Sequence, residues 1–107
     1  MPLRDRIGID LGRRVRLEEG IAWAARHDVR HIDIQLDTAA NAVTAFDAPR
    51  AAAVRAACEK HGIRLGLHTL SAVNVAEYSP YVAEAVDAYL KSYVDICPRL
   101  GAQWIVV

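Results

Sequence analysis

The sequence predicts an α/β protein of the order βαβαβαβ, whose parallel strands form the first half of a (β/α)8 TIM barrel. Strand patterns begin near residues 6, 31, 63 and 103, and a helical pattern fills each interval between them. The first three strand patterns each combine an apolar set of side chains with a polar or glycine set. The glycine-rich turn that follows the first strand of a doubly wound nucleotide-binding sheet has no counterpart in this sequence.

A period of two identifies the first three strands, over residues 6–11, 31–37 and 63–68. In an open sheet covered by helices on both faces, both sets of side chains would be largely apolar. In a barrel, one set contacts the helices and the other faces the interior. The fourth strand is the apolar run 103–107. The polar sets, which we therefore place inside a barrel, are Arg6, Gly8 and Asp10; His31, Asp33, Gln35 and Asp37; and Arg64, Gly66 and His68.

Helices are predicted in the intervals between these strands. Residues 17–26 carry apolar side chains at helical spacing. Asp47 is placed as the N-cap of a second helix, with Pro49 in its first turn, where a missing N–H is harmless. That helix runs to about residue 61, and Gly62 is expected to terminate it in the left-handed conformation.

A third helix is expected to begin at Ser79-Pro80. Pro98 should kink or end it, because proline removes an interior hydrogen bond. The chain then reaches its fourth strand and stops at Val107. Since a complete barrel needs about 250 residues, we expect residues 1–107 to be a single partial domain, the N-terminal half of a barrel truncated after strand four.

Composition excludes several classes of protein. The 13 Lys and Arg residues balance 13 Asp and Glu residues, so no net charge attracts nucleic acid or an anionic membrane. No apolar stretch is long enough to span a membrane and no signal peptide is visible. Cys58 and Cys97 lack metal-type spacing and are expected to be buried free thiols. We therefore expect a cytoplasmic protein.

Polar side chains at the predicted strand tips are the candidate site. Asp10, Gln35, Asp37 and His68 are expected to converge at one rim of the barrel, where such folds carry their chemistry. The imidazole of His68 suits proton transfer, substrate contact or metal ligation, and the alternative is a hydrogen-bonded structural histidine. Asp10 could orient a substrate hydroxyl or be a buried structural carboxylate.

Other polar residues are expected to be structural. Arg6 and Arg64 lie near the barrel floor, where ion pairs with Asp33 are the ordinary explanation. No nucleophilic triad is visible, and no carboxylate pair has a spacing that demands glycosidase chemistry. One histidine cannot make a metal site, which needs three or more ligands.

The order of several segments resembles the xylose-isomerase-like TIM-barrel superfamily. They are RIGIDLG, HIDIQLD, HGIRLGLHTLSAVNVAEYSP and LGAQWIVV. This superfamily contains sugar-phosphate isomerases and epimerases, inositol-catabolic enzymes and apurinic endonucleases of the endonuclease IV type. The resemblance covers the whole chain, but only the first half of the family's barrel. Its most specific part is His68 followed by Asn74 and then by a helix that starts at Ser79-Pro80.

The resemblance implies roles for individual residues. His68 matches a position that binds zinc in the endonuclease branch and more often lines the substrate pocket in the isomerase branch. Asn74 matches a loop asparagine that shapes the rim, and Gln35 stands where many members have glutamate. The family's main metal ligands come from later strands, which have no counterpart here.

The resemblance therefore implies a parent enzyme that uses a divalent metal (Mn, Mg, Co or Zn) to isomerise or epimerise a sugar or sugar phosphate. Asp10, Gln35, His68 and Asn74 would contact the substrate, and the 107-residue chain alone is expected to be inactive and to bind no metal well. One alternative is a fragment of a metal-dependent abasic-site nuclease, which the neutral charge disfavours. Another is a non-enzymatic half-barrel that self-associates through its open sheet edges.

Overall fold

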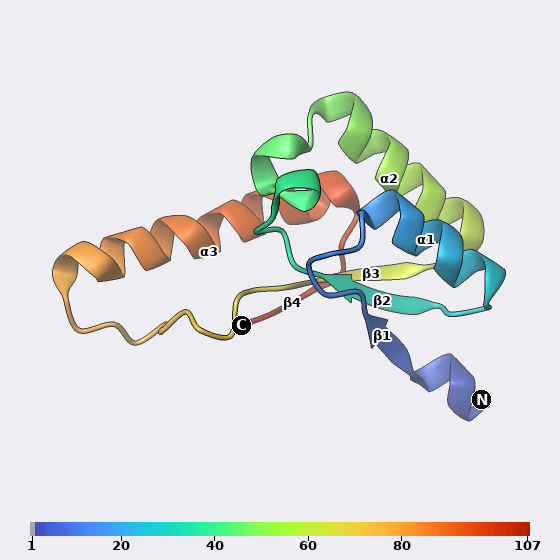
Figure 1. Cartoon of the computed structure of the whole chain (residues 1–107), viewed down its shortest axis with the longest axis horizontal. Coiled ribbons are helices and arrows are strands. Elements are labelled where there is room, and N and C mark those ends of the chain that lie inside the picture. The colour runs from blue at the N-terminus through green and yellow to red at the C-terminus, as the bar shows by residue number, and fades with distance from the viewer. Residues whose placement is uncertain (1) are drawn as a thin grey trace.

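The computed structural model describes residues 2–107 as four parallel strands alternating with three α-helices (Figure 1). The strands lie in the order β1-β2-β3-β4, each paired in parallel with the next. The predicted parallel βαβαβαβ order is confirmed. The element bounds are β1 Gly8–Asp10, α1 Leu17–Arg26, β2 His31–Ile34, α2 Ala48–His61, β3 Arg64–His68, α3 Pro80–Leu100 and β4 Trp104–Val106.

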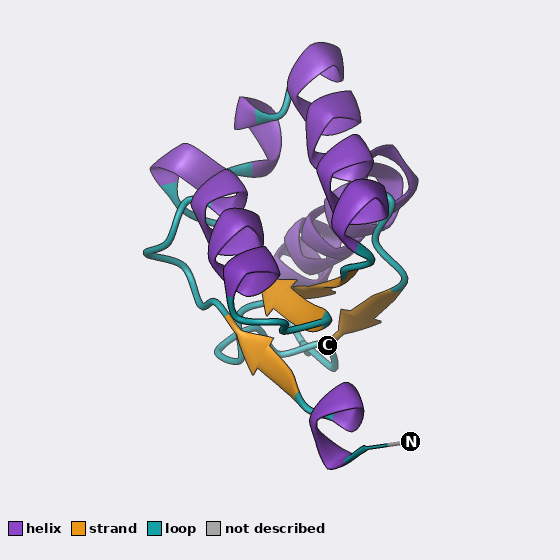
Figure 2. Ribbon diagram, turned by 90° about the vertical axis from the view of Figure 1, so that its right-hand side faces the viewer, coloured by secondary structure: helices purple, strands orange, loops and turns teal. Residues whose placement is uncertain are grey.

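All three helices pack on one face of the sheet, and no described element covers the other face (Figures 1 and 2). The helix-facing side chains of β2 and β3 are Ile32, Ile34, Leu65 and Leu67, which have no exposed surface. Each of these four side chains contributes roughly 1.5–3 kcal/mol by leaving water. The alternation predicted from the sequence thus separates a buried apolar face from a polar one. We call the uncovered side of β1–β4 the open face.

The ends of α2 follow from local chemistry. The Asp47 carboxylate accepts a hydrogen bond from the Arg50 N–H (2.8 Å), as an N-cap residue should. At the other end, Gly62 adopts φ = 64° and its N–H returns to the last turn of the helix. A side chain larger than hydrogen would be strained at this φ, so the chain reverses into β3 at this residue.

The helix α3 does not end at Pro98 but continues to Leu100. Pro98 lies two residues from the helix end, and the left-handed cap is supplied by Gly101 (φ = 68°). Only Tyr93, Ile96 and Leu100 of this helix are buried. The N-terminal half of α3 and the loop before it therefore extend past the edge of the sheet (Figure 1).

The connection between β2 and α2 is more ordered than its small, polar sequence suggested. It contains two short 3-10 turns, Ala39–Asn41 and Val43–Ala45. Asn41 is 1% exposed; its side chain accepts the Leu17 N–H (2.9 Å) and donates to the Val15 carbonyl (2.6 Å). This asparagine therefore satisfies a backbone donor in the first turn of α1 from a distant part of the chain.

No helix among residues 2–107 is both long enough and apolar enough to cross a membrane.

Candidate functional site at the open face

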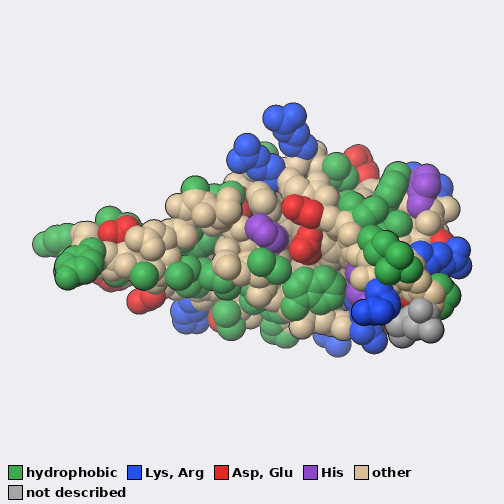
Figure 3. All heavy atoms as spheres, turned by 90° about the horizontal axis from the view of Figure 1, so that it is seen from below, with side chains coloured by type: hydrophobic (Ala, Val, Ile, Leu, Met, Phe, Trp, Pro, Cys, Tyr) green, Lys and Arg blue, Asp and Glu red, His purple; other side chains and the backbone are tan. Residues whose placement is uncertain are grey.

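Strand register determines which polar side chains are neighbours on the open face. Asp10 of β1 lies opposite Asp33 of β2, and Asp33 lies opposite Gly66 of β3. Gly66 lies opposite Trp104 of β4, so these four residues form one row across the sheet. Seen from this side, acidic and histidine side chains lie next to one another near the middle of the face (Figure 3).

Asp10 and Asp33 form a carboxyl pair at the end of β1. Burial is the largest cause that raises the pKa of Asp33, followed by the Asp10 charge. The nearby His68 charge lowers that pKa. Asp10 also accepts the Gly12 N–H (2.6 Å), which fixes its carboxylate at the strand tip. Asp33 is thus the carboxyl that holds a proton more readily than usual.

His68 ends β3 on the open face and is half-buried. Its Nδ1 atom is buried and has no hydrogen-bond partner within residues 2–107. The pairing of β2 with β3 ends at Ile34 and Leu67, and Gln35 and His68 each follow it by one residue.

Gln35 and Asp10 line different hollows. Gln35 lines a depression of about 370 Å³ together with Gly12, Arg13 and residues 70–72, between the loops that follow β1 and β3. Asp10 lines a separate depression of about 310 Å³ with Asp33 and Trp104. The two hollows share no lining residue and His68 lines neither, so Asp10, Gln35 and His68 do not meet in one hollow.

Asn74 lies in the exposed loop between β3 and α3. Its side chain accepts the Ala76 N–H (3.1 Å) and contacts the Glu77 carboxylate (3.5 Å). Glu77 in turn accepts the backbone N–H groups of Tyr78 and Ser79, which lower its pKa. Asn74 thus holds the conformation of this loop, which runs away from the sheet (Figure 1).

Asp37 faces α3 and does not join the other strand-tip residues. Tyr93 of α3 donates its hydroxyl to the Asp37 carboxylate (2.7 Å) and accepts the Leu36 N–H (2.9 Å). Tyr93 is fully buried, and burial raises the pKa of its hydroxyl far above the ordinary value. The tyrosine therefore stays neutral and anchors the end of β2 to the helix.

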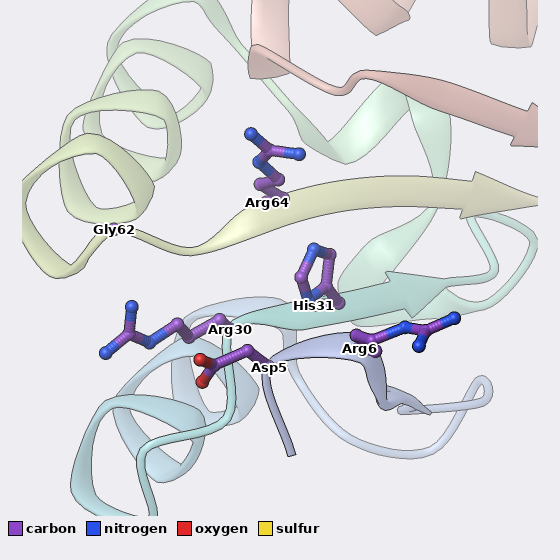
Figure 4. A pocket seen from close by; sticks show the side chains of 6 residues that line it. All are labelled: Asp5, Arg6, Arg30, His31, Gly62 and Arg64. Atoms are coloured by element: carbon purple, nitrogen blue, oxygen red, sulfur yellow. The ribbon is translucent and has the colours of Figure 1, made fainter. Parts of the chain in front are cut away.

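Arg6 and Arg64 do not pair with Asp33, contrary to expectation: neither arginine forms an ion pair in the described part of the chain. They line a hollow of about 500 Å³ at the amino ends of the strands, with Asp5, Arg30 and His31 (Figure 4). There, His31 and Arg64 project from the starts of β2 and β3, and Arg6 projects from the short 3-10 helix that precedes β1. The expectation was wrong because both arginines lie nearer the strand starts than Asp33 does.

The residues present do not fit a divalent metal by themselves. Among residues 2–107, no three His, Cys, Asp or Glu side chains are arranged to hold a metal ion. Asp10 and His68 lie near the Asp33 carboxyl, since the charges of both act on its pKa. We therefore derive no chemistry through a metal from this chain.

Two residues of the open face were missed from the sequence. Asp33 was assigned to ion pairs at the barrel floor, although it belongs to the same inward set as Asp10. Trp104 was included in a uniformly apolar strand. The strand register relates both residues to the polar sets. Asp10 of β1 lies opposite Asp33, and Gly66 of β3 lies opposite Trp104.

Comparison with solved structures supports the barrel interpretation. The chain matches the crystal structure of D-psicose 3-epimerase, determined in the presence of D-fructose, with a TM-score of 0.76 and 15% sequence identity. The match covers 92% of this chain and 35% of the epimerase chain. The chain has the fold of part of a TIM-barrel epimerase. Comparisons with protein-family profiles and with curated proteins gave no match.

The similarity confirms the predicted resemblance at the level of fold. This chain spans about a third of the length of the epimerase it matches. At 15% identity the match concerns the arrangement of strands and helices, and the fold alone does not fix an activity.

Proposed function

We propose that this chain is the first half of a sugar or sugar-phosphate isomerase or epimerase, whose open face lines the substrate cavity. The observation that carries this proposal is that the two faces of the sheet differ. Among residues 2–107, helices bury one face, while the other face presents carboxyl, amide and imidazole groups. The match to D-psicose 3-epimerase supports the choice of substrate class. Residues 1–107 are then one partial domain of a longer barrel.

Within this proposal, His68 and Gln35 contact sugar hydroxyls at the rim. His68 is half-buried at the end of β3, and Gln35 lines the hollow between the loops that follow β1 and β3. Asp10 accepts a hydrogen bond from a sugar hydroxyl in the hollow that it lines, and Asn74 holds the conformation of the loop between β3 and α3. Sugar hydroxyls both donate and accept hydrogen bonds, so this mixture of groups suits them.

Isomerisation and epimerisation both move a proton at a carbon next to a carbonyl, which requires a positioned acid and base. We assign those groups, and the ligands of any divalent metal, to the remaining strands of the barrel. This chain contributes binding and orientation of the substrate. An isolated preparation of residues 1–107 is therefore expected to turn over no sugar.

The test uses the longest in-frame protein that contains this sequence. In D2O, we expect this protein to exchange a C–H hydrogen of D-psicose or D-fructose for deuterium. NMR of the sugar follows the exchange. His68→Ala should lower kcat/KM by roughly tenfold or more, because a hydrogen bond to substrate is lost. His61→Ala is the matched control, since His61 is exposed at the end of α2.

Cleavage of an abasic-site DNA duplex by the same protein, without sugar exchange, would replace the proposal by the nuclease alternative. Unchanged kinetics in His68→Ala would remove His68 from the site while leaving the sugar activity in place.

A further inference from the structure

Two tyrosines of α3 contact the chain just beyond the ends of β2 and β3. The hydroxyl of Tyr93 accepts the Leu36 N–H (2.9 Å), and the hydroxyl of Tyr89 accepts the Leu70 N–H (2.9 Å). Leu36 and Leu70 each come two residues after the end of their strand. The tyrosines are one helical turn apart, and their ring centroids are 5.3 Å from each other. One face of α3 therefore holds the ends of two neighbouring strands.

The Tyr93 hydroxyl lies between the two chains at the point where the pairing of β2 with β3 stops. That pairing reaches Leu67 of β3 and goes no further. Beyond it, the hydroxyl accepts the Leu36 N–H on the β2 side and lies 3.4 Å from the His68 carbonyl oxygen on the β3 side. One hydroxyl therefore bridges the two chains where strand pairing no longer does.

The amides just before Leu36 and Leu70 have backbone partners. The Gln35 N–H donates to a carbonyl in the loop after β1 (3.1 Å), and the Thr69 N–H donates to a carbonyl of β4 (2.9 Å). The next amide along each chain donates to a tyrosine hydroxyl instead. Because backbone N–H groups inside a protein need a partner, these two hydroxyls complete the hydrogen bonding of both strand ends.

The chemistry of Tyr93 suits a fixed support and does not suit contact with substrate. The side chain has no exposed surface and comes from the helix-covered side of the sheet. Burial raises the pKa of its hydroxyl far above the ordinary value, so the hydroxyl stays neutral. Its hydrogen is donated to the Asp37 carboxylate (2.7 Å), which leaves the oxygen free to accept from Leu36.

The supported segments carry residues of the candidate site. Gln35 immediately precedes Leu36, and Leu70 lines the hollow of about 370 Å³ together with Gln35. His68 supplies the carbonyl oxygen beside the Tyr93 hydroxyl. A change at either tyrosine hydroxyl is thus transmitted to the open face through one or two backbone residues.

We propose that Tyr93 and Tyr89 are positioning residues, whose hydroxyls hold the chain beyond β2 and β3 so that Gln35 and His68 keep their places. The effect on sugar binding rests on the proposed function, whereas the hold on the two strand ends does not. The alternative is that both tyrosines only fill space beneath the sheet, in which case phenylalanine would serve equally well.

Replacing tyrosine by phenylalanine removes the hydroxyl and keeps the ring, so it tests the hydrogen bond by itself. In the isotope-labelled 107-residue protein, the Leu36 amide of Tyr93→Phe is expected to exchange with deuterium at least about tenfold faster than that of the parent. We also expect the NMR signals of the Gln35 side-chain amide and the His68 backbone amide to shift.

Tyr89→Phe gives a second, independent measurement. The Leu70 amide should exchange faster in this variant, because its N–H loses the Tyr89 hydroxyl. Tyr89 is only half-buried, so this substitution keeps the proposal testable if Tyr93→Phe fails to fold.

Two controls separate positioning from a general loss of stability. Tyr81→Phe is the same chemical change on the same helix, at a side chain that is 87% exposed, and should leave all these signals as in the parent. Val54→Ala shortens a core side chain of α2 that is 1% exposed, so it lowers stability without touching either hydroxyl. Its Gln35 and His68 signals should keep their parent positions.

Kinetics test the consequence for the site. In the longest in-frame protein that contains this sequence, Tyr93→Phe is expected to raise the KM for D-psicose or D-fructose about tenfold and to change kcat little, because the displaced groups bind substrate. Tyr81→Phe and Val54→Ala should have the KM of the parent.

Parent-like exchange at Leu36 and parent-like Gln35 signals in Tyr93→Phe would overturn the proposal, and so would equal shifts in Val54→Ala. Sugar turnover with an unchanged KM in Tyr93→Phe would reject the positioning role and keep the proposed function. Displaced Gln35 and His68 signals without turnover of any sugar would keep the hold on the strand ends and reject the proposed function.

Discussion

Asp33 shows how one residue links the open face to stability. Its folded-state pKa is raised above the unfolded value, mainly by burial and then by the Asp10 charge. The neutral form of Asp33 is therefore the one that the fold favours. The contribution is fully present below the unfolded pKa of an aspartate and is lost as pH rises through the raised folded pKa.

We predict that Asp33→Asn is more stable than the parent protein at neutral pH, because the amide carries no charge to bury beside Asp10. The difference in unfolding free energy should disappear as pH falls and the parent's Asp33 becomes protonated. Urea unfolding between pH 3 and pH 7 measures it. A stability difference that stays constant over this range would contradict the assigned cause. Asp87→Asn, exposed on α3, should show no such trend.

The elements show why some features were predictable and others were not. Both ends of α2 follow from residues at those ends, Asp47 and Gly62, so a local pattern was sufficient. The pairing of Asp10 with Asp33 depends on how β1 and β2 align across an intervening helix. Nothing local encodes that register, and the same holds for Trp104 beside Gly66.

Asn41 is a further case in which tertiary contacts decide. The segment that contains it was expected to be a polar connection, and a lone asparagine there carries no signal for burial. Its two hydrogen bonds reach the start of α1, more than twenty residues earlier in the chain. The order of this connection therefore depends on the position of α1.

We predict that Asn41→Ala lowers the free energy of unfolding by roughly 2 kcal/mol, because the Leu17 N–H and the Val15 carbonyl both lose their buried partner. Chemical denaturation followed by circular dichroism gives this value. Thr44→Ala, at an exposed position of the neighbouring 3-10 turn, should change stability by less than about 0.5 kcal/mol. Equal losses in the two variants would show that the segment tolerates substitution poorly as a whole.

At the scale of the whole molecule, β1 and β4 each pair with a single neighbouring strand within residues 2–107. Unpaired strand edges are templates for pairing with another chain. The open face adds half-buried side chains such as Trp104 to these edges. The same surface that would line a barrel cavity is thus available for self-association when the chain is alone.

We predict that the 107-residue protein associates reversibly with increasing concentration, as measured by sedimentation velocity. Val106→Lys, at the open-face position opposite His68 on β4, should shift the protein toward monomer, because a lysine at a strand edge must be desolvated on pairing. Val94→Lys is the control on α3, at a position that is 59% exposed. A monomer at all concentrations, or equal effects of the two lysines, would contradict association through the sheet.

The uneven support along α3 has its own consequence. Its buried residues lie in the last eight positions, at Tyr93, Ile96 and Leu100, while no residue of the turns that follow Pro80 is buried in the described chain. Unsupported helical turns open locally at little cost. Amide hydrogens near the start of this one helix should therefore exchange with deuterium far sooner than those near its end. Docking of a further element onto those first turns would erase the gradient, so exchange rates along α3 can report when the rest of a barrel is in place.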